Sequence, residues 1–164
     1  MNSGISTESM SALESEGVAL FVRVADLLNL PRSVGELYGI LFISEEPLCL
    51  DDLRLKLQIS KGSTSQGLKI LRSFGAIRTV YVPGDRKDFY VAESSLRKIA
   101  GGFASEQIQP HLESGSERLE RIRVLLAAES PSEALEERVE RLENWQKRAN
   151  QVLPVVLKLI GGRG

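Results

Sequence analysis

The sequence has very few side chains of the kinds that bind metals, form disulfides or carry redox chemistry. Among 164 residues there is one cysteine, Cys49, and one histidine, His111. A single cysteine excludes a disulfide within the chain, and these two side chains are too few for a structural zinc site. Cys49 lies between two leucines, which favours a small buried side chain over a reactive thiol. We therefore expect no metal and no cofactor.

Membrane-spanning segments and catalytic signatures are lacking as well. No apolar run reaches the roughly 18 residues of a membrane span, and the first residues lack the pattern of a secretory signal. We therefore expect a cytoplasmic protein with no membrane contact. The sequence shows no nucleophile beside a base, no paired metal-ligand spacing and no phosphate-binding glycine loop. The sequence accordingly predicts that the protein is not an enzyme.

Charge is distributed unevenly along the chain. The whole chain has a net charge of -1, yet residues 50–98 contain ten basic and five acidic residues, which gives this segment +5 and leaves -6 for the rest. A basic segment within an otherwise acidic chain is typical of a phosphate-binding surface. The acidic remainder discourages non-specific binding to DNA. The alternative is a solvated charged face, which would be preferred if the basic residues coincided with no recognisable motif.

The first hundred residues divide into a tail and a compact module. Residues 1–10 are polar and rich in serine, which is typical of a frayed, disordered end. From Ser11, apolar residues recur at helical spacing until about Asn29, and a second helix is predicted from Ser33 to just before Pro47. The stretch that follows Pro47 is expected to be extended. Residues 11–98 are thus predicted to form one domain.

Two further helices and a hairpin follow in the order of a winged helix-turn-helix. Helices are predicted over 51–57 and 61–74, with Ser60 as N-cap of the second and Gly75 at its end. Two strand-like segments come next, and Pro83-Gly84 between them fits the centre of a type II turn. In this motif the second helix enters the DNA major groove and the hairpin touches the flanking backbone. The predicted fold class is mainly α with a small β-hairpin wing.

Residues 99–164 are predicted to be a helical dimerisation region. Leu112, Leu119 and Leu126 repeat every seven residues in one segment, which Pro110 must kink or break near its start. A second helix is predicted with Ser130 as its N-cap. Its own seven-residue stripe consists of Leu135, Leu142, Ala149 and Val156. Such stripes favour packing of the helices on each other and on a second subunit. The alternative is an antiparallel hairpin within the chain and no dimer.

Polar and cationic residues of the basic segment are the candidates for DNA contact. Thr64 and Gln66 are suited to reading base edges, while lysines of the same helix neutralise phosphates. At the hairpin tip, Arg86 and Lys87 can reach the minor groove or its phosphates. The full set is Arg54, Ser60, Lys61, Gly62, Ser63, Thr64, Gln66, Lys69, Arg72, Arg78, Asp85, Arg86 and Lys87. Gly67 serves either close DNA approach or tight helix packing, and the sequence leaves this open.

Residues 59–62 and 84–90 resemble the winged helix of MarR-type repressors, in the branch that includes GbsR, and the likeness extends over roughly 31–98. The resemblance implies a homodimeric transcription factor whose N- and C-terminal helices form the dimer interface. Asp85 and Arg86 match an Asp and an Arg that MarR-type wings carry near the tip. Arg54 and Gln58 depart from the pattern, because a small residue and a glycine are usual there. Arg54 is therefore expected to extend to a phosphate, and Gln58 to be strained unless the turn differs.

The sequence therefore predicts a sequence-specific transcriptional regulator, a repressor, that binds a pseudo-palindromic operator in double-stranded DNA as a homodimer. Whether the protein responds to a small-molecule effector is left open. A cage that binds a quaternary ammonium needs several aromatic rings, and aromatic residues make up only 5% of the chain. The alternative function is a winged-helix module that assembles proteins without binding DNA.

Overall fold

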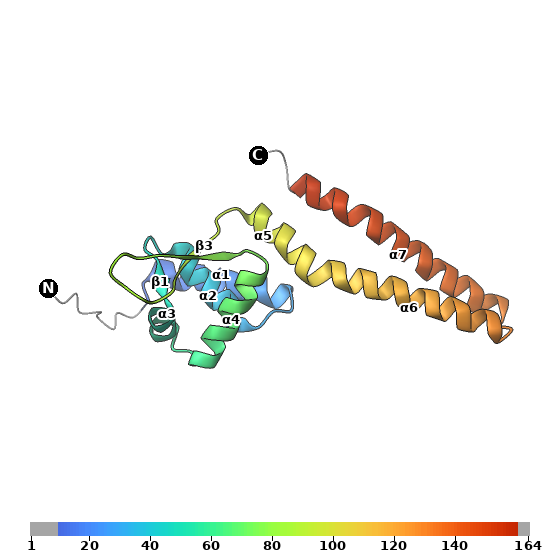
Figure 1. Ribbon diagram of the computed structural model, residues 1–164, viewed down its shortest axis with the longest axis horizontal. Helices are drawn as coiled ribbons and strands as arrows, with labels where there is room; N and C mark the ends of the chain where they lie inside the picture. The colour runs from blue at the N-terminus through green and yellow to red at the C-terminus, as the bar shows by residue number, and fades with distance from the viewer. Residues whose placement is uncertain (1–9, 161–164) are drawn as a thin grey trace. The chain divides into compact units, whose positions relative to one another are not determined.

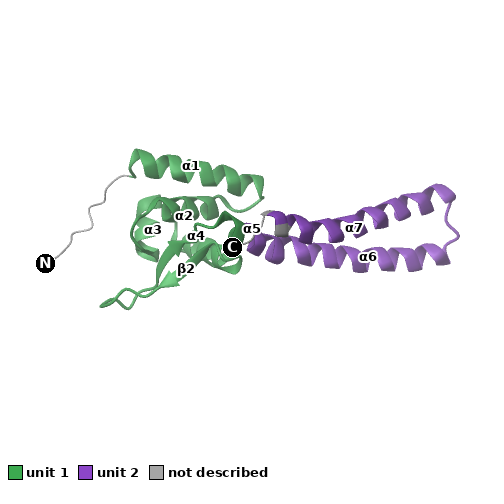
Figure 2. Ribbon diagram, turned by 90° about the horizontal axis from the view of Figure 1, so that it is seen from above, with its two compact units in different colours: residues 1–99 green, residues 100–164 purple. Residues whose placement is uncertain are grey.

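The structure, a computed structural model, describes residues 10–160 and shows two compact units, residues 1–99 and 100–164 (Figures 1 and 2). All but the last residue of the tail predicted for 1–10 lies outside the described residues. Each unit is built around its own helices, so the two are considered in turn.

The first unit begins with two helices that pack closely along each other. α1 (Ala12–Leu27) starts at a capping box: Ser11 Oγ accepts from the Glu14 N–H at 3.1 Å, and Glu14 Oε2 accepts from the Ser11 N–H at 2.8 Å. α2 (Arg32–Ile43) is buried along most of its length. A Cβ on Gly35 would lie 2.5 Å from the Phe21 carbonyl oxygen, so only glycine permits this approach of the two backbones. Both predicted helices are confirmed.

The helix-turn-helix consists of α3 (Leu50–Leu57) and α4 (Lys61–Ser73), which confirms two more predicted helices. Ser60 caps α4 as predicted, because its Oγ accepts from the Ser63 N–H at 3.1 Å. Gly75 ends α4 with φ of 71°, a left-handed conformation that glycine adopts without strain. The core of the unit is formed by α2, α3 and α4, which contribute Leu37, Ile40, Leu53, Leu68 and Leu71.

The wing is part of a three-stranded antiparallel sheet in the order β1-β3-β2. β2 (Ile77–Val80) and β3 (Phe89–Ala92) form the predicted hairpin, with Val80 opposite Phe89. The stretch after Pro47 is extended as expected, and it also forms β1 (Leu48–Cys49), which pairs with β3. The type II turn is confirmed: Gly84 has φ of 88°, and the Asp85 N–H donates to the Val82 carbonyl at 3.2 Å.

The second part of the chain is helical over its described length apart from the connection at 129–132. α5 (Leu96–Phe103) runs into the π-helical turn η1 (Ala104–Ile108), which is followed by α6 (Gln109–Ala128) and α7 (Glu133–Ile160). The disturbance expected at Pro110 takes the form of this π-turn, because proline lacks the N–H that a regular α-helical turn requires. The predicted N-cap of α7 is wrong. Ser130 has a left-handed φ of 48°, and the first helical hydrogen bonds run to the Ser132 carbonyl.

α6 and α7 form an antiparallel hairpin (Figure 2). Leu119 and Val139 are buried between the helices. A polar contact lies next to them, because Gln146 Nε2 donates to the Leu112 carbonyl at 2.6 Å. The Gln146 side chain also lies against Gly115, and a Cβ added to Gly115 would be 3.2 Å from Gln146 Nε2. A hydrogen-bonded glutamine packed closely against a glycine favours one register of the two helices.

Candidate nucleic-acid interface

The exposed face of α4 carries the side chains of five of the thirteen residues predicted to contact DNA. Lys61, Ser63, Gln66, Lys69 and Arg72 are all exposed. Leu68 and Leu71 on the opposite face anchor the helix in the core. Ser65, which sequence reasoning passed over, is exposed on the outward face as well.

The first turn of α4 is organised by Ser60 and Ser63. Ser60 Oγ donates to Ser63 Oγ at 2.9 Å while it also accepts from the Ser63 N–H. Lys61 and Gly62 are both exposed, and the Lys61 side chain forms no hydrogen bond or ion pair with a described residue. The outward amides of a helix start can accept a phosphate oxygen. The placement is compatible with the contacts predicted for these four residues.

The prediction that Thr64 contacts DNA is wrong. Its side chain is completely buried, and its Oγ1 donates to the Ser60 carbonyl at 2.9 Å. Thr64 lies four and seven residues before Leu68 and Leu71, so it shares their buried face of α4. A threonine in this position supports the turn between α3 and α4 and cannot read base edges.

The structure also decides the role of Gly67. This residue is buried against α2, and a Cβ placed on it would overlap Leu37 Cδ1. Gly67 therefore serves the close packing of α4 on α2 and not an approach to DNA.

Gln58 and Arg54, the two residues that depart from the MarR-type pattern, lie at the end of α3 and within it. Gln58 has φ of 54° and ψ of 37°, the left-handed conformation that glycine usually supplies. The strain expected for Gln58 is confirmed. Arg54 is half-buried on α3, and its contact with a phosphate stays a prediction.

The tip of the wing is held by Asp85 and exposes two cations. Asp85 Oδ1 accepts from the Lys87 N–H at 3.0 Å, which fixes the turn after Gly84. Arg86 and Lys87 are exposed, as is Arg78 on β2. Tyr81, which follows β2, is 80% exposed and was not recognised from the sequence. Exposed tyrosines on a cationic hairpin are suited to contacts with sugar and phosphate groups.

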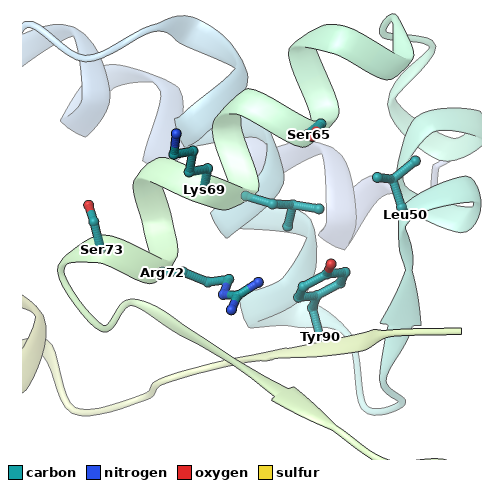
Figure 3. A pocket seen from close by; sticks show the side chains of 7 residues that line it. Leu50, Ser65, Lys69, Arg72, Ser73 and Tyr90 are labelled. Atoms are coloured by element: carbon teal, nitrogen blue, oxygen red, sulfur yellow. The ribbon is translucent and has the colours of Figure 1, made fainter.

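A depression of about 470 Å³ lies beside α4, and Tyr90 of β3 lines its far side (Figure 3). Leu50 and Leu68 supply its apolar part, and Lys69 and Arg72 supply two positive charges. Figure 3 shows Arg72 extending from α4 toward Tyr90. Nothing in the local sequence indicates this depression, because it depends on how α4 packs against the sheet.

Other candidate groups are structural. Cys49 is buried, which confirms the expectation of a small buried side chain, and this burial raises the pKa of its thiol. Phe21, Tyr38 and Phe42 pack ring against ring with centroids 4.7–5.8 Å apart. Among residues 10–160, no helix is both long and apolar enough to cross a bilayer.

Comparison with known proteins agrees with this geometry. No family model matches the chain. Over 78 residues the chain is 38% identical to the HTH-type transcriptional repressor GbsR of Bacillus subtilis (strain 168). The matched part is 48% of this chain and 43% of GbsR, so the chain corresponds to less than half the length of that repressor.

Solved structures give the fold. A crystal structure of a transcriptional regulator matches with a TM-score of 0.61 and 20% identity, over 92% of this chain and 99% of that chain. The fold is a winged helix-turn-helix. A weaker match, with a TM-score of 0.42 and 18% identity over 84% of this chain and 91% of that chain, is to a mutant of S. aureus MepR bound to an oligodeoxyribonucleotide. The predicted fold class and the predicted resemblance to GbsR are both confirmed.

Proposed function

We propose that this winged helix binds specific DNA sequences as a homodimer and represses transcription. Two recognition helices, one α4 from each subunit, would lie about 34 Å apart in successive major grooves of a pseudo-palindromic operator. Repression then follows from occlusion of the promoter. The similarity to GbsR, itself a transcriptional repressor, supports the proposal.

The observation that carries the proposal is the gathering of unpaired cations on α4 and the wing tip. Elsewhere some arginines and lysines form ion pairs, such as Lys56 with Glu14 and Arg123 with Glu143, and others, such as Arg118 and Arg138, form none with a described residue. The cations of α4 and of the wing tip form none with any described residue; they are Lys61, Lys69, Arg72, Arg86 and Lys87. Five exposed, unpaired positive charges on a recognition helix and a wing are what a phosphate backbone requires.

The homodimer is supported by an apolar stripe on α7 that the hairpin with α6 leaves uncovered. Val139 and Gln146 face α6, whereas the members of the neighbouring stripe follow one another at intervals of three, four or seven residues, as in the heptads of a coiled-coil seam. Its large side chains are each 39–76% exposed; they are Leu135, Leu142, Trp145, Val152, Val156 and Leu159. A second copy of the chain offers the same stripe, and a two-fold axis pairs identical surfaces.

α1 presents a second uncovered apolar stripe. Leu13, Leu20 and Leu27 are spaced seven residues apart and are 58–85% exposed. Water-exposed leucines at this spacing are costly for a monomer and are typical of a subunit interface.

Selection of bound fragments from sheared genomic DNA, followed by binding assays on the enriched sequences, tests the DNA part. We expect enrichment of inverted repeats whose half-sites are about one helical turn apart. A protein that dimerises but enriches no sequence would overturn repression by DNA binding and would favour a protein-assembly module.

Sedimentation equilibrium tests the dimer. We expect Leu142→Lys to produce a monomer, because a lysine in the seam must lose its hydration. Leu125→Lys is the matched control, since Leu125 is 62% exposed on α6 and lies outside the α7 stripe. A wild-type chain that is monomeric at micromolar concentration would contradict the homodimer.

A further inference from the structure

Glu93 lies in the connection at 93–95 that leads from β3 into α5 (Figure 1). Its N–H donates to the Ala76 carbonyl at 2.8 Å, directly before β2. Its own carbonyl accepts from the Tyr38 hydroxyl of α2 at 2.7 Å, although the two residues are 55 positions apart in the sequence. Ala76 and Glu93 form the base of the wing, where the hairpin leaves the core. The backbone of Glu93 therefore attaches this base to α2.

The carboxylate of Glu93 holds the start of α5. Oε1 accepts from the Ser95 N–H at 2.9 Å, and Oε2 lies 3.5 Å from Lys98 Nζ. Ser95 Oγ accepts in turn from the Lys98 N–H at 3.4 Å. The bond from the Ser95 N–H, together with the charge of Lys98, holds the pKa of Glu93 below its ordinary value, so the carboxylate is charged at neutral pH. The first turn of α5 is thus attached to the same residue as the base of the wing.

Tyr38 is held in place by its surroundings. Its ring is buried and packs against Phe21 and Phe42, with centroids 4.7 and 5.8 Å away. Burial first, and then the charge of Glu93, raises the pKa of Tyr38 to about 12, so the hydroxyl remains a donor at neutral pH. A buried tyrosine needs a partner for its hydroxyl, and the packed ring directs this hydroxyl to the Glu93 carbonyl.

We infer that Glu93 is a positioning residue that joins the wing to α5, so that the base of the wing and the first turn of α5 move together. Its backbone holds the wing to α2, and its side chain holds α5. A shift of α5 would therefore shift the wing with it. For its consequence on DNA binding the inference rests on the proposed function, because the position of the wing matters there only if the wing contacts DNA.

Hydrogen exchange in the free protein, followed by NMR, tests the joint. Tyr38→Phe removes the hydroxyl and keeps the ring. It should speed exchange in β2 and β3, and also at the Ile99 N–H of α5, which donates to the Ser95 carbonyl at 3.2 Å. We expect about three- to tenfold, the effect of one hydrogen bond. Glu93→Ala keeps the carbonyl that accepts from Tyr38 and loses the carboxylate. It should speed exchange at Ile99, and also in β2 and β3.

Two controls separate the joint from a general loss of stability. The Thr64 N–H, which donates to the Ser60 carbonyl at 3.0 Å at the start of α4, should exchange as in the wild type. Tyr90→Phe removes a hydroxyl from β3 itself that forms no hydrogen bond with any residue of the described chain, and it should leave all these amides unchanged. The joint is overturned if Tyr38→Phe affects only the strands and Glu93→Ala only α5, or if Thr64 is accelerated equally.

Double-mutant cycles on operator binding test the consequence for DNA. Tyr38→Phe should weaken binding by up to about tenfold. Most of this loss should vanish in an Arg86→Ala background, because the wing tip has then already lost its contact. In a Lys61→Ala background the loss should remain in full, because Lys61 belongs to α4. No loss, or equal losses in both backgrounds, would overturn the role of Glu93 in placing the wing. A wild type that binds no DNA would defeat the proposed function, and the exchange experiment would still decide the joint.

Discussion

Gly67 of α4 lies directly against Leu37 of α2, with no room for a methyl group between them. Leu37 is fully buried, so its side chain has little space to move aside. The contact sets how closely α4 approaches the core, and thereby where its outward residues stand.

Gly67→Ala should destabilise the protein although alanine is the better helix former. Overpacking a buried contact costs about 1–3 kcal/mol, which exceeds the gain in helix propensity of up to about 1 kcal/mol. Chemical denaturation measures the difference. Gly62→Ala is the control, because a Cβ there would meet nothing closer than Ser60 Oγ at 3.9 Å. Gly62→Ala should leave stability unchanged or raise it, and an equal loss in both variants would contradict the packing argument.

Gln58→Gly should stabilise the protein. A non-glycine residue in the left-handed region costs roughly 1–2 kcal/mol, and glycine removes this cost. Glycine also loses more backbone entropy on folding, which offsets about 0.5–1 kcal/mol of the gain. We therefore expect a higher melting temperature. Asn29, with φ of 54°, provides the comparison, since asparagine tolerates this conformation better and Asn29→Gly should gain less. A lower melting temperature for Gln58→Gly would show that its side chain makes a contact worth more than the strain.

The link between α1 and α3 should make stability depend on pH. Lys56 Nζ donates to Glu14 Oε1 at 2.5 Å, and this bond, followed by the bond from the Ser11 N–H, holds the pKa of Glu14 below its ordinary value. A lowered pKa in the folded state means that the stabilisation is fully present above about pH 4.3, the ordinary pKa of glutamate, and is lost as the pH falls through the folded pKa.

Glu14→Gln keeps the capping box with Ser11 and removes only the charge. It should lower the melting temperature at pH 7, and the difference from the wild type should shrink toward pH 3. Glu16→Gln, an exposed neighbour for which no ion pair is found among the described residues, should differ little from the wild type at either pH. A Glu14→Gln deficit that stays constant from pH 7 to pH 3 would show that the ion pair is not its cause.

Trp145 reports directly on the proposed seam of α7. It is the only tryptophan in the sequence, and it is 63% exposed in a single chain. If the seam pairs with a second copy, its emission should move to shorter wavelength and acrylamide should quench it less as the protein concentration rises. Leu142→Lys should abolish this dependence. Strong quenching at concentrations where sedimentation shows a dimer would place the subunit interface elsewhere.

Features set by a few adjacent residues could be predicted from the sequence. The Ser60 cap, the end of α4 at Gly75 and the turn at Pro83-Gly84 each depend on the conformational preferences of one or two residues, and all three are confirmed. The burial of Thr64 could have been predicted as well. Its spacing from Leu68 and Leu71 places it on their face, but a polar side chain was interpreted as exposed.

Features that depend on distant partners could not be predicted. β1 is two residues long and exists because β3 lies beside it, so Leu48 and Cys49 alone carry no strand signal. The depression between Arg72 and Tyr90 depends in the same way on tertiary packing. The start of α7 was misplaced because Ser130 and Ser132 are both acceptable caps, and the geometry of the connection from α6 decides between them.

The salt dependence of operator binding tests the central claim most directly. Each phosphate contact contributes about -0.9 to the slope of log K against log salt concentration, because bound counterions are released. The account predicts a steep negative slope for the wild type and a flatter one for Lys69→Ala combined with Arg86→Ala, by about 0.9 for each contact removed. A wild-type slope near zero, or a double variant with unchanged affinity and slope, would contradict the assignment of α4 and the wing as the DNA-binding surface.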